Sequence, residues 1–446
     1  MKTVICGANG IGLHLAKLLF RDDEDVVLID ENEEKLSFFS NDFDLMTITA
    51  SPTSVEVQRE AGVQNADLFV AVNADENINI TCCIIAHALG AKKTIARIDS
   101  PEFMRESKEL FSNAGIDSVV YPEFLAGEEI AAALETSWAR LRWDVYNGAL
   151  VLLGVKLRES CNILDKPLHD ICGPTDPFHI VAIKRNGDTL IPSGSETLKC
   201  NDIAYIMTTK EQVPYIRRIV GKEPYPDVKN VIIAGGGKSA VRAAKAMKGK
   251  YKVKIIEIDE ERCETLNGYF NDEDIMVING DGRDLGLLTE EGIEHTEAFV
   301  ALTGNSETNI LACLTAKKLG VKKTVAMVEN LDYVNMAEGL DIGTIVNKRT
   351  ITASYIYQKT LKADVKNVKF MMTVNADVAE FVVAEGAKVT KDLVKNLKLP
   401  ADMNIGGLIR DGVGYLVSGN TQIFPGDRVV VFFHETMIRK MEKYFT

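Results

Sequence analysis

The chain lacks an apolar run long enough to cross a bilayer. Its densest apolar stretch, residues 148–155, falls far short of the roughly 20 residues that a membrane-spanning helix needs. The opening MKTVICGANG leads from a short apolar segment straight into a glycine turn, which predicts a strand rather than a signal peptide. We therefore expect a cytoplasmic protein of several domains.

Basic residues are also in short supply. The chain has 51 Lys and Arg against 64 Asp and Glu, for a formal net charge of −13. Binding to nucleic acid or to anionic lipid as a general activity requires a basic surface, so this balance argues against both.

Patterns that would indicate catalysis or metal binding are missing. The eight cysteines form no CxxC pair, and most lie in apolar runs, as buried thiols do in a reducing compartment. Cys82 and Cys83 are adjacent within an apolar helical pattern, which favours packing. The six histidines are scattered without metal-ligand spacing, and nothing pairs a nucleophile with a base. We predict no metal site and no catalytic residue.

What the sequence does contain is an internal repeat. Residues 46–98 aligned with 276–328, an offset of 230, are identical at 17 of 53 positions. Matching pairs include Gly62 with Gly292, Asn79 with Asn309, and Lys92-Lys93-Thr94 with Lys322-Lys323-Thr324. Chance would supply about 3 or 4 identities at average residue usage. A module of about 225 residues is therefore duplicated.

Each copy has two parts. The first alternates short apolar runs with helical patterns, which predicts βαβ units and a parallel sheet. The second has short strands joined by tight turns, such as Asn186-Gly187 and Asp411-Gly412. The fold class is thus α/β, with two Rossmann-like domains each followed by a small α+β domain. Residues 222–227 contain two prolines and form the linker between the two copies. Residues 124–140 carry apolar side chains at helical spacing, which predicts a helix whose apolar stripe serves either core packing or a subunit contact.

A glycine turn follows the first strand of each copy. Gly7-Ala8-Asn9-Gly10-Ile11-Gly12 opens a helix, and a turn of this kind can hold a pyrophosphate with backbone N–H groups. Asn9 stands at the second glycine position, where a side chain hinders close approach of phosphate. The second copy has Gly235-Gly236-Gly237-Lys238-Ser239-Ala240. It is not a P-loop, because Ile232 occupies the position of that motif's first glycine.

An acidic residue ends the second strand of each copy. Asp30 lies 23 residues after Gly7, and Glu257 lies 22 after Gly235. A carboxylate there can accept both ribose hydroxyls of an adenosine and disfavours a 2′-phosphate, so NAD(H) is favoured over NADP(H). Arg97 ends a later strand at the same sheet edge and predicts either a phosphate contact or a surface salt bridge. Its repeat partner is Met327.

A dehydrogenase is the alternative enzymatic hypothesis. Tyr355 and Lys359 match the Tyr-xxx-Lys pair of short-chain dehydrogenases, but they lie beyond the second strand–helix unit. A third hypothesis is a duplicated scaffold whose clefts no longer bind ligand.

The motifs together resemble the TrkA family, the peripheral nucleotide-binding subunits of bacterial and archaeal Trk potassium uptake systems. The resemblance rests on the glycine turns, Asp30, residues 59–62, 66–72 and 75–77, Ala96-Arg97-Ile98 with Ser100-Pro101-Glu102, and the turns of the small domains. It implies tandem RCK (regulator of K⁺ conductance) domains. The implied boundaries are residues 1–123 for the first N-terminal RCK domain, 124–140 for its crossover helix, 141–224 for the first C-terminal RCK domain, 228–345 for the second N-terminal domain, 346–364 for its crossover helix, and 365–446 for the second C-terminal domain.

By the same resemblance, NAD⁺ or NADH, and also ATP or ADP, would bind the Rossmann clefts. The first cleft would use Gly7, Ala8, Asn9, Gly10, Ile11, Asp30, Asn73, Ala74 and Arg97. The second would use Gly235, Gly236, Gly237, Lys238, Ser239, Glu257, Asp281, Thr303 and Gly304. The chain departs from the family pattern at three places. Asn9 replaces the second glycine, and Ala50-Ser51 replaces the Gly-Asp pair that copy two keeps as Gly280-Asp281. Met327 replaces the arginine.

The resemblance further implies a non-enzymatic regulator without a nucleic-acid partner. It would attach to the inner face of the membrane through a Trk-type potassium-translocating protein. Chains would associate as a homodimer or homotetramer, placing Rossmann domains in a ring. Nucleotide binding would shift the population of domain orientations and so gate the membrane partner.

Overall fold

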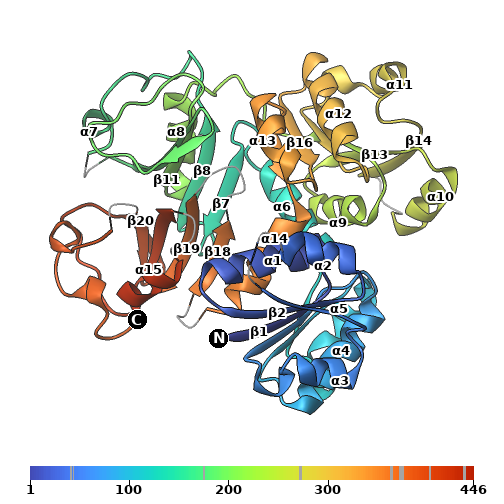
Figure 1. The fold of residues 1–446 in the computed structure, drawn as a ribbon. Coiled ribbons are helices and arrows are strands. Elements are labelled where there is room, and N and C mark those ends of the chain that lie inside the picture. The colour runs from blue at the N-terminus through green and yellow to red at the C-terminus, as the bar shows by residue number, and fades with distance from the viewer. Residues whose placement is uncertain are drawn as a thin grey trace. The chain divides into compact units, whose positions relative to one another are not determined.

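The computed structural model describes residues 1–446 except 41–42, 44, 174–175, 271–273, 362–364, 371–375, 401–402 and 435–437. It divides into two compact units, Met1–Leu125 with Lys348–Lys362, and Ala126–Asn347 with Ala363–Thr446. No helix among the described residues combines the length and apolarity that crossing a membrane requires. Figure 1 labels the elements.

The first unit is built on a parallel sheet with strand order β3-β2-β1-β4-β5-β6. Ile5 of β1 pairs with Leu28 of β2 on one side and Val70 of β4 on the other, so the order reverses between β1 and β4. Ligands of open α/β sheets bind at such a reversal point. The elements are β1 (Lys2–Cys6), α1 (Gly10–Arg21), β2 (Asp25–Asp30), α2 (Glu33–Ser40), β3 (Met46–Thr49), α3 (Val55–Glu60), β4 (Leu68–Ala71), α4 (Glu76–Leu89), β5 (Thr94–Arg97), α5 (Pro101–Asn113), β6 (Ser118–Val120) and α14 (Lys348–Gln358).

The second unit contains a sheet of the same topology, in the order β14-β13-β12-β15-β16-β17. The reversal lies between β12 and β15, the repeat partners of β1 and β4. The elements are α6 (Pro122–Leu134), β12 (Asn230–Ala234), α9 (Lys238–Met247), β13 (Lys252–Glu257), α10 (Glu260–Tyr269), β14 (Ile275–Asn279), α11 (Leu285–Glu290), β15 (Ala298–Ala301), α12 (Ser306–Lys318), β16 (Lys323–Met327), α13 (Asp332–Gly339) and β17 (Thr344–Val346).

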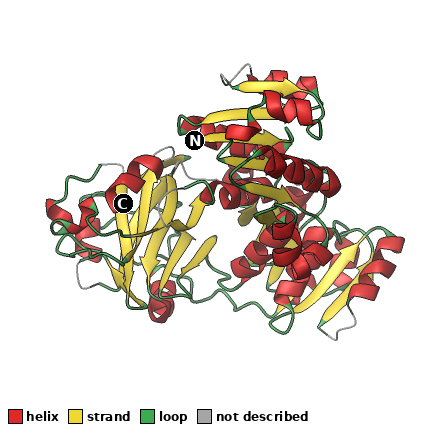
Figure 2. Cartoon of the chain, turned by 90° about the horizontal axis from the view of Figure 1, so that it is seen from below, coloured by secondary structure: helices red, strands yellow, loops and turns green. Residues whose placement is uncertain are grey.

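Two antiparallel sheets complete the second unit, in the orders β10-β9-β11-β8-β7 and β18-β19-β22-β20-β21. Figure 2 shows these regions as mostly strand and loop, whereas the parallel sheets carry helices on their faces. The elements are β7 (Leu141–Val145), β8 (Leu150–Lys156), α7 (Leu168–Ile171), β9 (Phe178–Arg185), β10 (Asp188–Leu190), β11 (Ile203–Thr208), α8 (Val213–Ile219), β18 (Val365–Phe370), β19 (Ala376–Val382), β20 (Met403–Arg410), β21 (Val413–Leu416), β22 (Arg428–His434) and α15 (Ile438–Phe445).

The two small domains share one hydrophobic core. Leu152 and Val181 of the first antiparallel sheet pack with Val430 and Phe432 of the second. Both predicted hairpins are present. The φ angles at their turns are positive, 53° and 94° for Asn186 and Gly187 and 53° and 81° for Asp411 and Gly412. Only residues that tolerate a positive φ suit such turns. The predicted fold class, two parallel α/β sheets each followed by a small α+β domain, is confirmed.

The crossover helices are exchanged between the copies. In the first unit, α14 from the second copy packs along α1 of the first, and Figure 1 shows the two side by side. There, the Tyr357 hydroxyl contacts the Asp22 carboxylate. In the second unit, Gly127 of α6 lies so close to α9 that a Cβ would sit 2.7 Å from the Arg242 Cβ. The stripe over 124–140 therefore buries residues against a Rossmann domain other than its own.

The helix predicted over 124–140 is shorter in the structure and ends at Leu134. Ile130 and Leu134 are buried as the stripe predicts, but Phe124 is 37% exposed. Trp138 is buried beyond the helix end, within the core of the first small domain. By Arg140 the chain has joined the antiparallel sheet, where the Arg140 N–H donates to Gly154 O, 2.8 Å away, at the start of the β7–β8 pairing.

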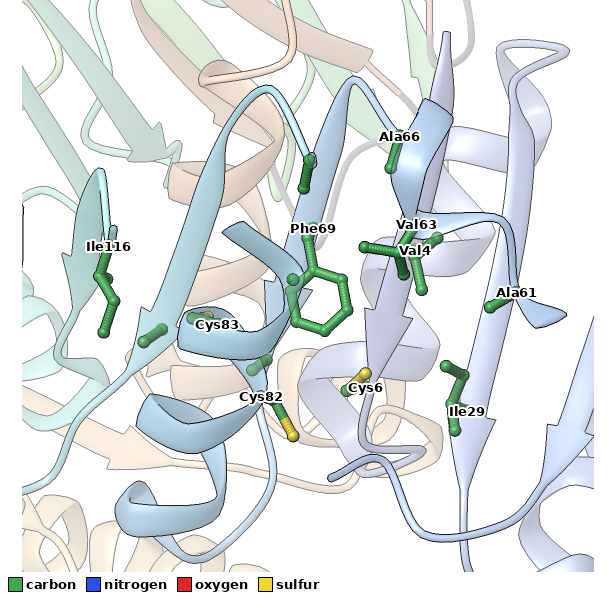
Figure 3. Packing of buried hydrophobic residues seen from close by; sticks show 14 of the residues in the cluster. Val4, Cys6, Ile29, Ala61, Val63, Ala66, Phe69, Cys82, Cys83 and Ile116 are labelled. Atoms are coloured by element: carbon green, nitrogen blue, oxygen red, sulfur yellow. The ribbon is translucent and has the colours of Figure 1, made fainter. Parts of the chain in front are cut away.

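The vicinal cysteines lie in the core of the first Rossmann domain, as predicted. Figure 3 shows Cys82 and Cys83 with Phe69 and Cys6 in one apolar cluster. The Cys83 thiol donates to Ile95 O at 3.4 Å, and its repeat partner Cys313 donates to Val325 O at 3.5 Å. Burial raises the pKa of Cys313 to about 12, so this thiol packs rather than reacts.

Candidate functional site

The two glycine turns lie at the carboxyl ends of β1 and β12, where each parallel sheet reverses its order. Gly7 and Gly235 have φ angles of 110° and 100°, which a residue with a side chain rarely adopts. A Cβ on Gly7 would also lie 2.9 Å from the Asn73 amide nitrogen, and one on Gly235 would lie 2.9 Å from Leu302 O. Each turn therefore touches the loop after the neighbouring strand, and each such pair of turn and loop at the sheet edge is here termed a Rossmann cleft.

The predicted acids are brought to these turns. The Asp30 carboxylate accepts the Ala8 N–H at 2.6 Å and the Asn32 N–H at 2.9 Å. Glu257 repeats the arrangement by accepting the Gly236 N–H at 2.5 Å and the Asp259 N–H at 3.0 Å. Each carboxylate is thereby oriented across the mouth of the turn. A carboxylate oxygen can accept more than one hydrogen bond, so each retains capacity for a ribose hydroxyl.

The two turns differ at the residue that caps the following helix. Asn9 caps α1, because its Oδ1 accepts the Ile11 N–H at 2.9 Å and the Gly12 N–H at 3.2 Å. Its Nδ2 donates to Val72 O. Gly237 stands at the same place before α9, where no side chain makes a capping bond and an added Cβ would meet nothing within 4 Å. The N-terminus of α9 is thus more open to an anion than that of α1.

Gly10 and Ile11 open α1 in different surroundings. Ile11 is buried, whereas Gly10 lies against the side chain of Arg349 from α14. The exchanged helix therefore brings a guanidinium to the start of α1. Arg349 could not be assigned to the site from the sequence, because nothing in the local pattern of residues 348–358 connects it with residue 10.

In each copy, an asparagine that was not among the predicted site residues braces the loop after the central strand. Asn79 Oδ1 accepts the Asn73 N–H at 2.7 Å, while its Nδ2 donates to Asn73 O and Arg97 O, each at 3.0 Å. Asn309 does the same with the Thr303 N–H at 2.9 Å, Thr303 O at 3.0 Å and Met327 O at 2.8 Å. The signal was present, since Asn79 and Asn309 are identical in the repeat.

These braces hold the predicted loop residues at the sheet edge. Asn73 and Thr303 are half-buried beside the glycine turns, and Ala74 and Gly304 are exposed next to them. In the second copy, the Thr303 hydroxyl donates to Asn309 Oδ1 at 2.7 Å. In the first copy, the side-chain amide of Asn73 makes the equivalent bond by donating to Asn79 Oδ1 at 3.0 Å.

Arg97 lies at the end of β5 as predicted, and it is engaged in an ion pair. Its Nη2 is 3.1 Å from an Asp99 carboxylate oxygen, and its side chain is 15% exposed. The Asp99 and Ser100 N–H groups in turn donate to Glu76, at 2.7 and 2.9 Å. Of the two alternatives for Arg97, the structure contains the salt bridge, and a phosphate contact would require the guanidinium to leave Asp99 or to be shared.

Basic residues gather around the second turn. Lys238 begins α9 and is exposed, whereas Ser239 beside it is buried. Arg262 donates from Nε to Gly236 O at 2.9 Å. The loop carrying Asp281 lies against the end of β12, because a Cβ on Gly282 would be 2.7 Å from the Ala234 Cβ. Arg283 binds Asp281 at 2.7 Å, and its hydrogen bond holds the pKa of that carboxyl below the usual range.

Each cleft thus combines a left-handed glycine, a carboxylate on the turn and a helix N-terminus. This set can hold the ribose and pyrophosphate of an adenine dinucleotide. Among the described residues, no group of three or more His, Cys, Asp or Glu side chains could hold a metal ion.

Known proteins share this organisation. The chain spans about the full length of Trk system potassium uptake protein TrkA from Haemophilus influenzae, at 32% identity over 100% of this chain and 98% of that protein. TrkA from Azorhizobium caulinodans is 29% identical over the same shares.

Solved structures with this fold are the RCK domain of GsuK (TM-score 0.61, 16% identity, 100% of this chain and 94% of that one), the GsuK channel bound to NAD (0.59, 15%, 100% and 78%) and GsuK bound to ADP (0.51, 15%, 80% and 68%). At these identities the likeness concerns the fold.

The TrkA-N domain model matches residues 3–122 and 231–348, and the TrkA-C domain model matches 378–446. The two TrkA-N matches each contain a glycine turn with its acid and braced loop, and with the full-length relatives they show that the chain belongs to the TrkA family.

Proposed function

We propose that the chain is a nucleotide-sensing regulatory subunit of a potassium uptake system. Its Rossmann clefts bind NAD⁺ or NADH, and also ATP or ADP, and its membrane partner is a Trk-type potassium-translocating protein. The observation that carries the proposal is the repeated arrangement of glycine turn and carboxylate, Ala8 N–H on Asp30 and Gly236 N–H on Glu257.

Family membership supports the potassium-uptake role, since the full-length relatives are named for it. It also separates the chain from the oxidoreductases, and the chain is not one of them. Tyr355 lies in α14, and the Lys359 ammonium that follows this helix lies over the Tyr355 ring, 5.1 Å from its centroid.

In the proposed mechanism, nucleotide joins the two sides of each cleft. The adenosine ribose binds Asp30 or Glu257, and the phosphates lie between the glycine turn and the braced loop containing Asn73 or Thr303. The ligand favours whichever domain arrangement brings these sides closest, by its differential affinity for the two arrangements. Chains associate as a dimer or tetramer with Rossmann domains in a ring, attached to the inner membrane face through the partner.

The testing experiment is rubidium uptake at limiting external potassium in cells lacking the gene. Wild type, Asp30→Ala and Glu257→Ala chains are supplied in turn, and each purified chain is titrated with NADH. Wild type restores uptake, and each variant loses binding at its own cleft. Nucleotide at 100 times its Kd stabilises the wild type by about 2.7 kcal/mol, which raises its melting temperature.

Two outcomes would count against the proposal. Unchanged uptake in cells without the gene would remove the transport role. Full restoration by a variant with both acids replaced and no nucleotide binding would leave the clefts without a regulatory function.

A further inference from the structure

A second kind of site lies away from both glycine turns, in a cavity within the second unit. Its volume is about 200 Å³. It is lined by the segment preceding β7, the end of β8, the linker after α8, the end of α12 with β16, and the turn between α13 and β17. It therefore lies where the first small domain meets the second Rossmann domain.

Cationic side chains dominate the walls of this cavity. Six of them are Arg140, Lys156, Arg158, Lys222, Lys317 and Lys323, and the exposed Lys322 is a seventh. Among the described residues that line the cavity, Asp341 is the one carboxylate. The chain as a whole has a net charge of −13, so a cavity lined mainly by positive charges is unusual in it and requires a specific explanation.

Asp341 is already shared by three cations. Its carboxylate pairs with Arg140 and Arg158, and the Lys317 ammonium lies 3.3 Å from one of its oxygens. Lys323 is satisfied differently, because its Nζ donates to Ala139 O at 2.6 Å and to the Thr344 hydroxyl at 3.0 Å. The carboxylate therefore has no capacity to neutralise the remaining lysines.

Lys156 and Lys222 make no ion pair with any described residue. Lys222 is only 3% exposed, and its ammonium lies over the Tyr225 ring, 4.8 Å from the centroid. A buried ammonium is normally paired with a carboxylate or hydrogen-bonded, since its desolvation is costly. A buried lysine without a carboxylate partner of its own, beside two arginines that already share Asp341, is the arrangement of an anion-binding site whose anion comes from outside the chain.

The electrostatics agree with this geometry. Burial, followed by repulsion from Arg158 and Arg140, lowers the pKa of Lys222 to about 8. Burial and repulsion from Arg140 and Arg158 lower the pKa of Lys317 to about 8, and burial with Arg140 lowers that of Lys323 to about 7. A bound anion would remove the repulsive part of each shift.

The cavity also restricts the size of the anion. It is smaller than the roughly 300–1,000 Å³ of sites that enclose a drug-sized ligand. Guanidinium groups favour bidentate contacts with phosphate oxygens, and ammonium groups add point charges that suit a multiply charged anion.

We propose that this cavity binds a pyrophosphate group, either as the inorganic anion or as the phosphate end of a nucleotide. The ligand would join the first small domain, through Lys156 and Arg158, to the second Rossmann domain, through Lys317. It would thus be a second regulatory input, independent of whether the glycine turns bind NAD.

The test is calorimetric titration of the full-length chain with inorganic pyrophosphate. The cavity variant is Lys156→Gln with Lys222→Gln. Its matched control is Lys318→Gln, an exposed lysine that follows Lys317 on α12 and does not line the cavity. A cleft variant, Asn9→Asp with Gly237→Asp, places a carboxylate at each helix N-terminus and leaves the cavity untouched.

Wild type and the cleft variant both bind pyrophosphate. With the clefts blocked by the cleft variant, adding Lys156→Gln and Lys222→Gln weakens the remaining binding at least about tenfold, as expected for losing charge-assisted hydrogen bonds, whereas adding Lys318→Gln leaves it unchanged. The cavity variant melts no lower than wild type, because it removes repulsion, so weak binding does not reflect unfolding. Loss of binding in the cleft variant with retention in the cavity variant would overturn the proposal, as would a wild type that binds no pyrophosphate.

Competition then distinguishes the two sources of the anion. The cleft variant is first saturated with pyrophosphate and then titrated with ADP. Displacement identifies the phosphate end of a nucleotide as a ligand of the cavity, whereas its absence identifies the free anion, and either result upholds the pyrophosphate site.

Discussion

The two Rossmann clefts share a framework and differ in how the helix after the glycine turn is capped. In both, a carboxylate binds the turn and an asparagine braces the opposite loop. In the first, the Asn9 side chain occupies the N–H groups at the start of α1, whereas Gly237 leaves the start of α9 without a capping side chain. Duplication has kept the parts that shape each cleft and varied the part that would meet phosphate. We therefore expect the second cleft, in the proposed function, to accept a pyrophosphate without displacing a capping side chain.

The largest effect is expected from Gly12→Ala in the first copy. A Cβ on Gly12 would overlap Gly7 O, so the substitution forces strand and helix apart. We expect a loss of about 3 kcal/mol in the free energy of unfolding, measured with urea, as for overpacked cores. The second copy has Ala at this place, and Ala240→Gly should cost only about 1 kcal/mol. Equal effects in the two copies would mean that the turns pack alike.

The caps are compared by exchanging them. Gly237→Asp fits the open position and places a negative charge where phosphate would bind. Like charges a few ångströms apart repel by several kcal/mol at an effective dielectric constant of about 20. The affinity of the second cleft for NADH should therefore fall by about 100-fold. Asn9→Gly should strengthen binding at the first cleft. Calorimetry with each single variant gives both constants and the stoichiometry. Tighter binding in Gly237→Asp would contradict the role assigned to the cap.

The braces should behave alike in both copies. Asn79→Ala and Asn309→Ala each remove hydrogen bonds to buried backbone groups on two loops, and each should cost about 2 kcal/mol of stability. Thermal unfolding of the two variants, with exposed Asn77→Ala as the control, checks this. A large effect at one site and none at the other would show that the framework too has diverged.

The smallest predicted effect is a pH dependence that belongs to the second unit. Lys222 and Lys317, with pKa values of about 8, and Lys323, at about 7, release their protons in the folded chain well below the unfolded value of about 10.4. Between about pH 7 and 10 the unfolded chain binds more protons, so stability rises with pH. Arg140 and Arg158 oppose protonation of Lys222 and Lys317, and Arg140 opposes that of Lys323, whereas the Asp341 carboxylate, 3.3 Å from Lys317 Nζ, favours protonation of Lys317.

The measurement is the melting temperature at pH 7 and pH 9.5 without added phosphate. We expect a rise of about a few degrees in the wild type and a smaller one in the Lys156→Gln, Lys222→Gln variant. A fall with pH in the wild type, or the same rise in the variant, would mean that the lysines are not held in a repulsive cluster.

Much of this protein followed from its sequence, because the deciding signals are local or periodic. The repeat offset, the alternation of strands and helices, the turns at Gly7 and Gly235 and the acids Asp30 and Glu257 are each set by short-range chemistry. A parallel sheet then brings the ends of neighbouring strands to one edge, so acid and turn could be placed together from the chain order alone.

Tertiary structure decided the rest, because it pairs residues that no local pattern connects. Four features depend on packing: the placement of Arg349 against Gly10, the end of α6 at Leu134, the pairing of Arg97 with Asp99, and the gathering of Lys156, Lys222 and Lys317 in one cavity. Local patterns in the chain are enough to establish two glycine turns, each followed by an acid at the end of the next strand. Only the packed chain determined how each is capped and that a third, cationic cavity lies in the second unit, because side-chain charge accumulates from segments distant along the chain.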